Sequence, residues 1–118
     1  MPTKSTLPLP PFFNPKNAGE WGYTPDLGNL FATSQSWAKS HGVKPASSDQ
    51  FKLDLLVIDA QKDFCFPKGT LYVGGRSGTG AVDDNRRTAE FIYKNLGRIT
   101  NVRGTFDTHF AYQIFFSS

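Results

Sequence analysis

Residues 55–64, LLVIDAQKDF, constrain the fold of this chain more than any other segment. Four apolar residues run directly into Asp59, and a short polar stretch follows that closes on an aromatic side chain. A strand that does not alternate with polar residues belongs inside a parallel sheet that is covered on both faces. We therefore predict a core strand over residues 53–60. Asp59 then lies at the carboxyl end of this strand, where open α/β sheets place their chemistry.

Two other segments have the apolar spacing of helices. Residues 29–41 can begin at Asn29 as the cap and end before Gly42. Residues 83–96 begin with acidic side chains, end with basic ones, and can be terminated by Gly97. The predicted apolar faces consist of Leu30, Ser34, Trp37 and Ala38 in the first helix, and of Ala89, Ile92, Leu96 and Ile99 in and just after the second.

A second strand is predicted over residues 101–106, and it ends on Asp107. The order of strand, helix and strand predicts a βαβ unit with a right-handed crossover. If the two strands are parallel neighbours, the carboxylates of Asp59 and Asp107 emerge at the same edge of the sheet. The expected fold class is therefore α/β with a parallel sheet.

Residues 1–28 hold six prolines and are expected to form an extended arm without regular structure. Aromatic side chains would anchor this arm to the rest of the chain: Phe12, Phe13, Trp21 and Tyr23. The spacing of Pro8 and Pro11 also fits a polyproline-II ligand, although a packing arm is the favoured interpretation. Residues 46–50 are expected to be a polar linker.

Composition excludes several functional classes. The net charge of +3 is modest and no segment carries a dense basic stripe, which argues against a nucleic-acid partner. No apolar run approaches the roughly 20 residues that span a bilayer. The single cysteine, Cys65, cannot form an internal disulfide, so a cytoplasmic protein is the expectation.

Several residues allow a chemical and a structural interpretation. Asp59 could act as a general base or could cap the loop that follows it. Asp107 and His109 could be two ligands of one metal, or could form a hydrogen bond with each other. Cys65 could be a nucleophile, but a packed small apolar residue is the favoured interpretation. The glycine-rich residues 74–80 could bind an anion through backbone N–H groups, but a tightly turned loop is favoured.

The motif LLVIDAQKDFC resembles the D-x-Q-x-D-F motif of the isochorismatase-like cysteine hydrolases, which include the nicotinamidases. The spacing to Asp107-Thr108-His109 and the stretch GGRSGTGAVDDNRRTAEFIYKNL are also similar to that family, and the resemblance covers nearly the whole chain. The resemblance implies a three-layer, Rossmann-like fold. It also implies hydrolysis of small amides such as nicotinamide by an Asp-Lys-Cys triad.

The resemblance implies roles for four residues. Asp59 would be the acid of the triad, Phe64 would line the substrate pocket, and Asp107 with His109 would bind a divalent metal, zinc or iron. Cys65 matches the cysteine after the D-F pair and not the family's nucleophile. The triad lysine and cysteine lie beyond the last matching segment, and the positions of a further histidine ligand hold Phe115 and Phe116.

We therefore expect residues 1–50 to form the arm and a helix, and residues 51–118 to form the N-terminal part of a hydrolase domain. The chain would then be a truncated or fragmentary hydrolase, inactive by itself, with an incomplete sheet. Residues 110–118 carry no charge and six apolar side chains, which supports that expectation. The alternative is an inactive chain with a binding role, docked on a homologous subunit as a homo- or hetero-oligomer.

Overall fold

The computed structural model describes residues 6–107, and within them the sheet consists of two parallel strands, β1 (Asp54–Val57) and β2 (Asn101–Gly104). The register pairs Leu55 with Val102 and Val57 with Gly104. The mixed helix and strand architecture with a parallel sheet is confirmed. Both strands are shorter than predicted, although backbone hydrogen bonds between Thr105 and Val57 and between Asp59 and Thr105 continue beyond their ends.

Helix α3 (Gly80–Lys94) lies between the two strands in the chain. It begins three residues before the predicted start, at a glycine whose N–H donates to the Gly74 carbonyl oxygen at 2.8 Å. A Cβ at Gly80 would lie 2.9 Å from that oxygen, so glycine permits this close start. Asn95, and not Gly97, caps the C-terminus. Among the described residues, no helix is long and apolar enough to cross a membrane.

Helix α1 (Leu27–Ser40) also begins earlier than predicted. The cap is Asp26, whose carboxylate accepts a hydrogen bond from the Asn29 backbone N–H at 3.2 Å. The prediction that Asn29 caps the helix is therefore wrong. The helix begins two residues before Asn29, and the Asp26 side chain accepts the hydrogen bond of an N–H group in the first turn. The C-terminal end was predicted within one residue, and Gly42 follows it with φ +67°.

The N-terminal arm is anchored by aromatic side chains, as expected. Phe12 packs edge-on against Trp37 and Tyr93, with ring centroids 6.3 and 5.9 Å apart. Trp21 packs edge-on against Phe66 at 6.2 Å. The arm is not wholly irregular, since a 3-10 helix, η1 (Pro15–Gly19), interrupts it. A second short 3-10 helix, η2 (Ala46–Ser48), lies in the predicted linker.

The glycine-rich segment after β1 is a tightly turned loop, as favoured. The Tyr72 hydroxyl donates to the Gly78 carbonyl oxygen at 2.6 Å, and Gly75 and Gly78 adopt φ values of +66° and +77°. Residues 71–73 are not in a strand. Instead, a four-residue helix, α2 (Lys62–Cys65), follows β1 where only a loop was expected.

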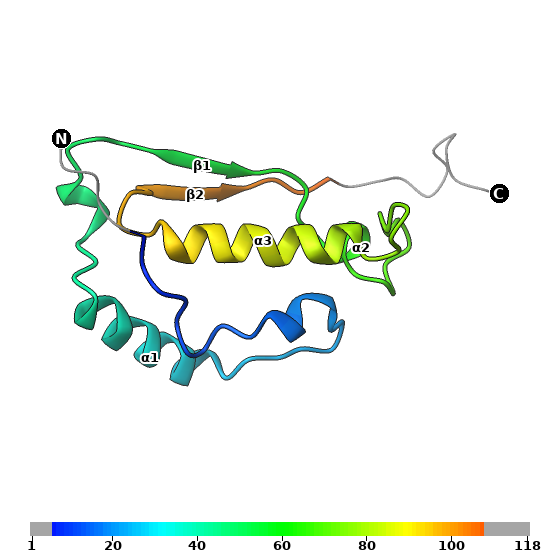
Figure 1. The fold of residues 1–118 in the computed structure, drawn as a ribbon, viewed down its shortest axis with the longest axis horizontal. Helices are drawn as coiled ribbons and strands as arrows, with labels where there is room; N and C mark the ends of the chain where they lie inside the picture. The colour runs from blue at the N-terminus through cyan, green and yellow to red at the C-terminus, as the bar shows by residue number, and fades with distance from the viewer. Residues whose placement is uncertain (1–5, 108–118) are drawn as a thin grey trace.

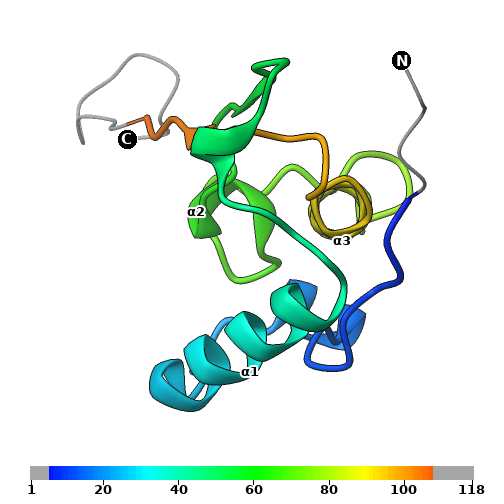
Figure 2. The same cartoon turned by 90° about the vertical axis from the view of Figure 1, so that its left-hand side faces the viewer.

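The elements lie in successive layers (Figures 1 and 2), in which α3 separates the sheet from α1 and the arm. Among the described residues, the buried apolar side chains include Trp37, Cys65 and Ile99. The opposite face of the sheet is open, because Leu56 and Ile58 are 56% and 68% exposed. Within residues 6–107 the helices lie on one side of the sheet, so these residues cover β1 on one face only.

Candidate functional site

The candidate site lies at the carboxyl edge of the sheet, just beyond β1 and β2. Because the two strands are parallel and in register, the residues that follow them meet at this edge. We call these residues the edge cluster, and it consists of Asp59, Gln61, Thr105 and Asp107. The prediction that Asp59 and Asp107 emerge at the same edge is confirmed.

Asp59 turns the chain out of the sheet. Its φ of +56° makes it the one non-glycine residue with positive φ among those described. A left-handed conformation costs about 1–2 kcal/mol for most L-residues, although aspartate tolerates it better. The turn is closed by the Gln61 N–H, which donates to the Asp59 carbonyl oxygen at 2.9 Å. Strain of this kind, fixed by surrounding contacts, is typical of functional sites.

Thr105 holds Asp59 through both backbone and side chain. The Asp59 N–H donates to the Thr105 carbonyl oxygen at 3.2 Å and to its hydroxyl at 3.1 Å. The same hydroxyl donates to the Asp59 carboxylate at 3.2 Å. The candidate acid is thus fixed by the residue that follows β2, and sequence reasoning did not identify Thr105 as part of the site.

Within the edge cluster, the side chain of Gln61 is hydrogen-bonded to the backbone of Asp107. Its side-chain Nε2 donates to the Asp107 carbonyl oxygen at 3.1 Å, and its Oε1 accepts from the Asp107 N–H at 2.8 Å. Sequence reasoning also missed this residue. The available signal was the central glutamine of the D-x-Q-x-D-F motif itself.

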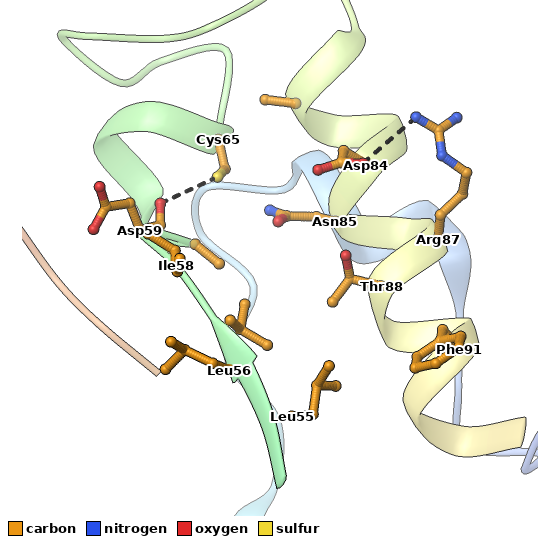
Figure 3. A pocket seen from close by; sticks show the side chains of 13 residues that line it. Leu55, Leu56, Ile58, Asp59, Cys65, Asp84, Asn85, Arg87, Thr88 and Phe91 are labelled. Carbon is orange, nitrogen blue, oxygen red and sulfur yellow. Dashed lines mark hydrogen bonds and ion pairs between the residues drawn. The ribbon is translucent and has the colours of Figure 1, made fainter. Parts of the chain in front are cut away.

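Cys65 is buried, as favoured from the sequence, and it is not paired with the candidate acid. It is 8% exposed, and its thiol donates to the Asp59 carbonyl oxygen at 3.9 Å. Figure 3 shows the Asp59 carboxylate pointing away from Cys65 and from α3. The carboxylate and this thiol therefore do not form a base–nucleophile pair.

An open cleft of about 500 Å³ lies between β1 and α3. Leu55 points into it and Leu56 points away, as Figure 3 shows. The α3 wall contributes polar side chains, including Asp84, which pairs with Arg87 at 3.7 Å. The lining residues of the cleft are Leu55, Leu56, Val57, Ile58, Asp59, Ala60, Cys65, Ala81, Asp84, Asn85, Arg87, Thr88 and Phe91. A space of this size is in the range that holds a small molecule.

Of the other residues predicted for the site, Phe64 and Asp107 do not line the cleft. Phe64 lies on α2, half-buried and outside the cleft lining. Asp107 is exposed at the sheet edge, and His109 lies outside the described residues. Within residues 6–107, no group of three potential ligands lies close enough together to hold a metal ion.

Comparisons of the chain with protein-family models, with curated proteins and with solved structures find no match. The interpretation of the site therefore depends on its own geometry and on the motifs of the sequence.

Proposed function

We propose that this chain supplies the acid–base residue of a cysteine hydrolase that acts on small amides, in the manner of the isochorismatase-like enzymes. The complete domain would have the three-layer fold of that family. The observation that carries the proposal is the position of Asp59, which lies just beyond the carboxyl end of β1 and is hydrogen-bonded to Thr105, the residue that follows the parallel strand β2. An aspartate held in this way at the strand edge is suited to accept and return a proton.

The reaction needs a thiol next to the Asp59 carboxylate. The thiol proton passes to the carboxylate, and the sulfur bonds to the amide carbon. The C–N bond then breaks as Asp59 returns the proton to the leaving nitrogen, which departs as ammonia. Water next attacks the thioester carbon and gives a proton to Asp59. The C–S bond then breaks and Asp59 returns the proton to the sulfur, which restores the thiol and releases the carboxylic acid. Asp59 thus acts as base and acid in turn.

The nucleophile and the triad lysine would come from protein outside residues 1–118. The one cysteine of this chain, Cys65, donates its thiol hydrogen to a backbone oxygen and lies away from the Asp59 carboxylate. A longer native chain or a homologous subunit would supply the reactive thiol. Asp107 and His109 remain our proposed ligands for zinc or iron in such an assembly.

The test uses protein purified from its natural source. An intact mass shows whether the native chain extends beyond residue 118, and release of ammonia from nicotinamide measures the activity. Replacing Asp59 by asparagine in the native protein should lower kcat by at least about 100-fold, which is the usual contribution of a general acid–base residue. Asp63→Asn is the matched control, because Asp63 is an exposed acid on α2.

Three results would count against this proposal. The native protein could release no ammonia, Asp59→Asn could leave the rate unchanged, or Asp63→Asn could lower it equally. The isolated chain of 118 residues should show no turnover. Ammonia release by it would mean that Cys65 or another group replaces the expected nucleophile.

The alternative function is a binding role, in which the chain docks on a homologous subunit. The observation that favours it is the open face of the sheet, where Leu56 and Ile58 are more than half exposed. Co-purification with a homologous subunit, together with a lack of activity in the complex, would favour this alternative. A lone monomer under native conditions would exclude it.

A further inference from the structure

Two threonines make the same pair of hydrogen bonds at opposite ends of β2. At the N-terminal end, the Thr100 hydroxyl accepts from the Leu53 N–H at 2.9 Å and donates to the Asp49 carboxylate at 3.0 Å. At the C-terminal end, the Thr105 hydroxyl accepts from the Asp59 N–H and donates to the Asp59 carboxylate. Each hydroxyl therefore joins β2 to a backbone N–H and to an aspartate.

The two ends differ in what the aspartate can do. Asp49 lies just after η2, at the end of the sheet remote from the edge cluster. Asp59 lines the cleft and stands where the chain leaves the sheet with positive φ. The same hydrogen bond thus stabilises the fold at one end and sets the direction of the Asp59 carboxylate at the other.

The hydroxyl of Thr105 is the group that orients the Asp59 side chain. The backbone bond from the Asp59 N–H to the Thr105 carbonyl oxygen, at 3.2 Å, does not need the hydroxyl. A carboxylate has two oxygens on a side chain that can adopt several staggered rotamers, and a donor to one oxygen selects among them. Without the hydroxyl, the backbone can keep its path while the carboxylate loses its fixed direction.

We propose that Thr105 is a positioning residue for Asp59, and that it directs the carboxylate toward the β2 side of the sheet edge and away from Cys65. Its role in catalysis rests on the proposed function of Asp59. The orientation itself can be measured without any activity, so the two claims can be separated.

The first measurement is the side-chain rotamer of Asp59 in the full chain labelled with ¹³C and ¹⁵N. Three-bond couplings to the Asp59 carboxyl carbon report whether it occupies one rotamer. We expect one rotamer in the wild type and in Thr105→Ser, which keeps the hydroxyl. We expect averaging over staggered rotamers in Thr105→Val, which keeps the shape and removes the donor. Thr100→Val should leave the Asp59 couplings unchanged, because it removes the corresponding bond at the far end.

The second measurement is kinetic and uses the native protein with nicotinamide. Thr105→Val should lower kcat by about ten- to a hundredfold, with little change in KM, because the loss is one of orientation. Thr105→Ser should restore most of the rate, and Thr100→Val should keep it. If Thr105→Val does not fold, Thr105→Ala serves as the variant without a hydroxyl.

One rotamer of Asp59 in Thr105→Val, or averaging already in the wild type, would overturn the positioning role. Averaging in Thr100→Val as well would also overturn it, because the effect would then be one of general stability. If the wild type releases no ammonia, the proposed function fails, while the couplings still decide whether Thr105 orients Asp59.

Discussion

The side chain of Gln61 continues the hydrogen bonding between the two parallel strands, because it bonds to both the N–H and the carbonyl oxygen of Asp107. The ladder continues past the strands, since the Thr105 N–H donates to the Val57 oxygen at 3.0 Å and the Asp59 N–H to the Thr105 oxygen at 3.2 Å. By the same alternation, the Asp107 N–H would next donate to the Asp59 carbonyl oxygen, and the Gln61 N–H would donate to the Asp107 carbonyl oxygen. Because Asp59 turns the chain away, the side-chain amide of Gln61 supplies the donor and the acceptor instead.

We predict that Gln61→Met, which keeps the length of the side chain and removes both hydrogen bonds, lowers the free energy of unfolding by about 1 kcal/mol. Hydrogen exchange at the Asp107 amide should become faster in this variant, because its acceptor is lost. Urea unfolding and amide exchange by NMR measure the two effects. Gln35→Met, the same change at an exposed site on α1, is the control, and equal exchange rates at Asp107 in both variants would contradict the prediction.

This substitution of a side chain for the backbone explains why Gln61 was missed. The apolar runs predicted the parallel strands and the shared edge, because burial and register depend on composition and order. The role of Gln61 depends on the positive φ of Asp59, and neither the sequence of a polar loop nor its charge indicates that dihedral angle. Helix α2 was not predicted, because its four residues are too few to show a helical period.

The open face of β1 shows a second limit of prediction. Residues 55–58 are apolar throughout, and such a run indicates that both faces of the strand are suited to burial. Which elements reach each face depends on the rest of the sheet, and within residues 6–107 helix α3 covers one side only. The three-layer fold therefore remains a prediction, while the parallel pairing is established.

We predict that Asp26→Ala destabilises α1 and that Asn29→Ala does not. The Asp26 carboxylate accepts the Asn29 backbone N–H at the start of the helix, whereas the Asn29 side chain lies inside the first turn. Loss of such a cap typically costs about 1 kcal/mol. Urea unfolding followed by far-ultraviolet circular dichroism gives the comparison. A larger loss of unfolding free energy in Asn29→Ala than in Asp26→Ala would contradict this prediction and favour Asn29 as the cap.

We predict that stability falls at high pH through Tyr93. Burial against Phe12 and Phe13, with a smaller contribution from Tyr23, raises the pKa of the Tyr93 phenol. The unfolded chain, with an ordinary pKa near 10, loses this proton first, so the folded state binds more protons above that pH. The stabilising contribution is therefore complete below about pH 10 and is lost as pH rises toward the folded-state pKa.

Tyr93→Phe tests this dependence, because phenylalanine packs in the same place without an ionisable group. Urea midpoints measured between about pH 9 and pH 11 should fall less steeply in this variant than in the wild type. The phenolate absorbance of the folded wild type should include a late step that Tyr93→Phe lacks. Parallel curves for the two proteins would show that Tyr93 does not titrate differently in the folded and unfolded states.

Two isoleucines at opposite extremes of burial test whether the open face of the sheet is covered in solution. Ile99 is 8% exposed and Ile58 is 68% exposed. Ile99→Ala should lower the free energy of unfolding by about 2–4 kcal/mol, since a buried side chain leaves a cavity. Ile58→Ala should cost less than about 1 kcal/mol if its face meets water. Urea unfolding at two protein concentrations, with sedimentation velocity, provides the comparison.

A cost at Ile58 that matches the cost at Ile99, and that grows with protein concentration, would mean that another protein surface covers β1. This result would favour the binding role over the hydrolase.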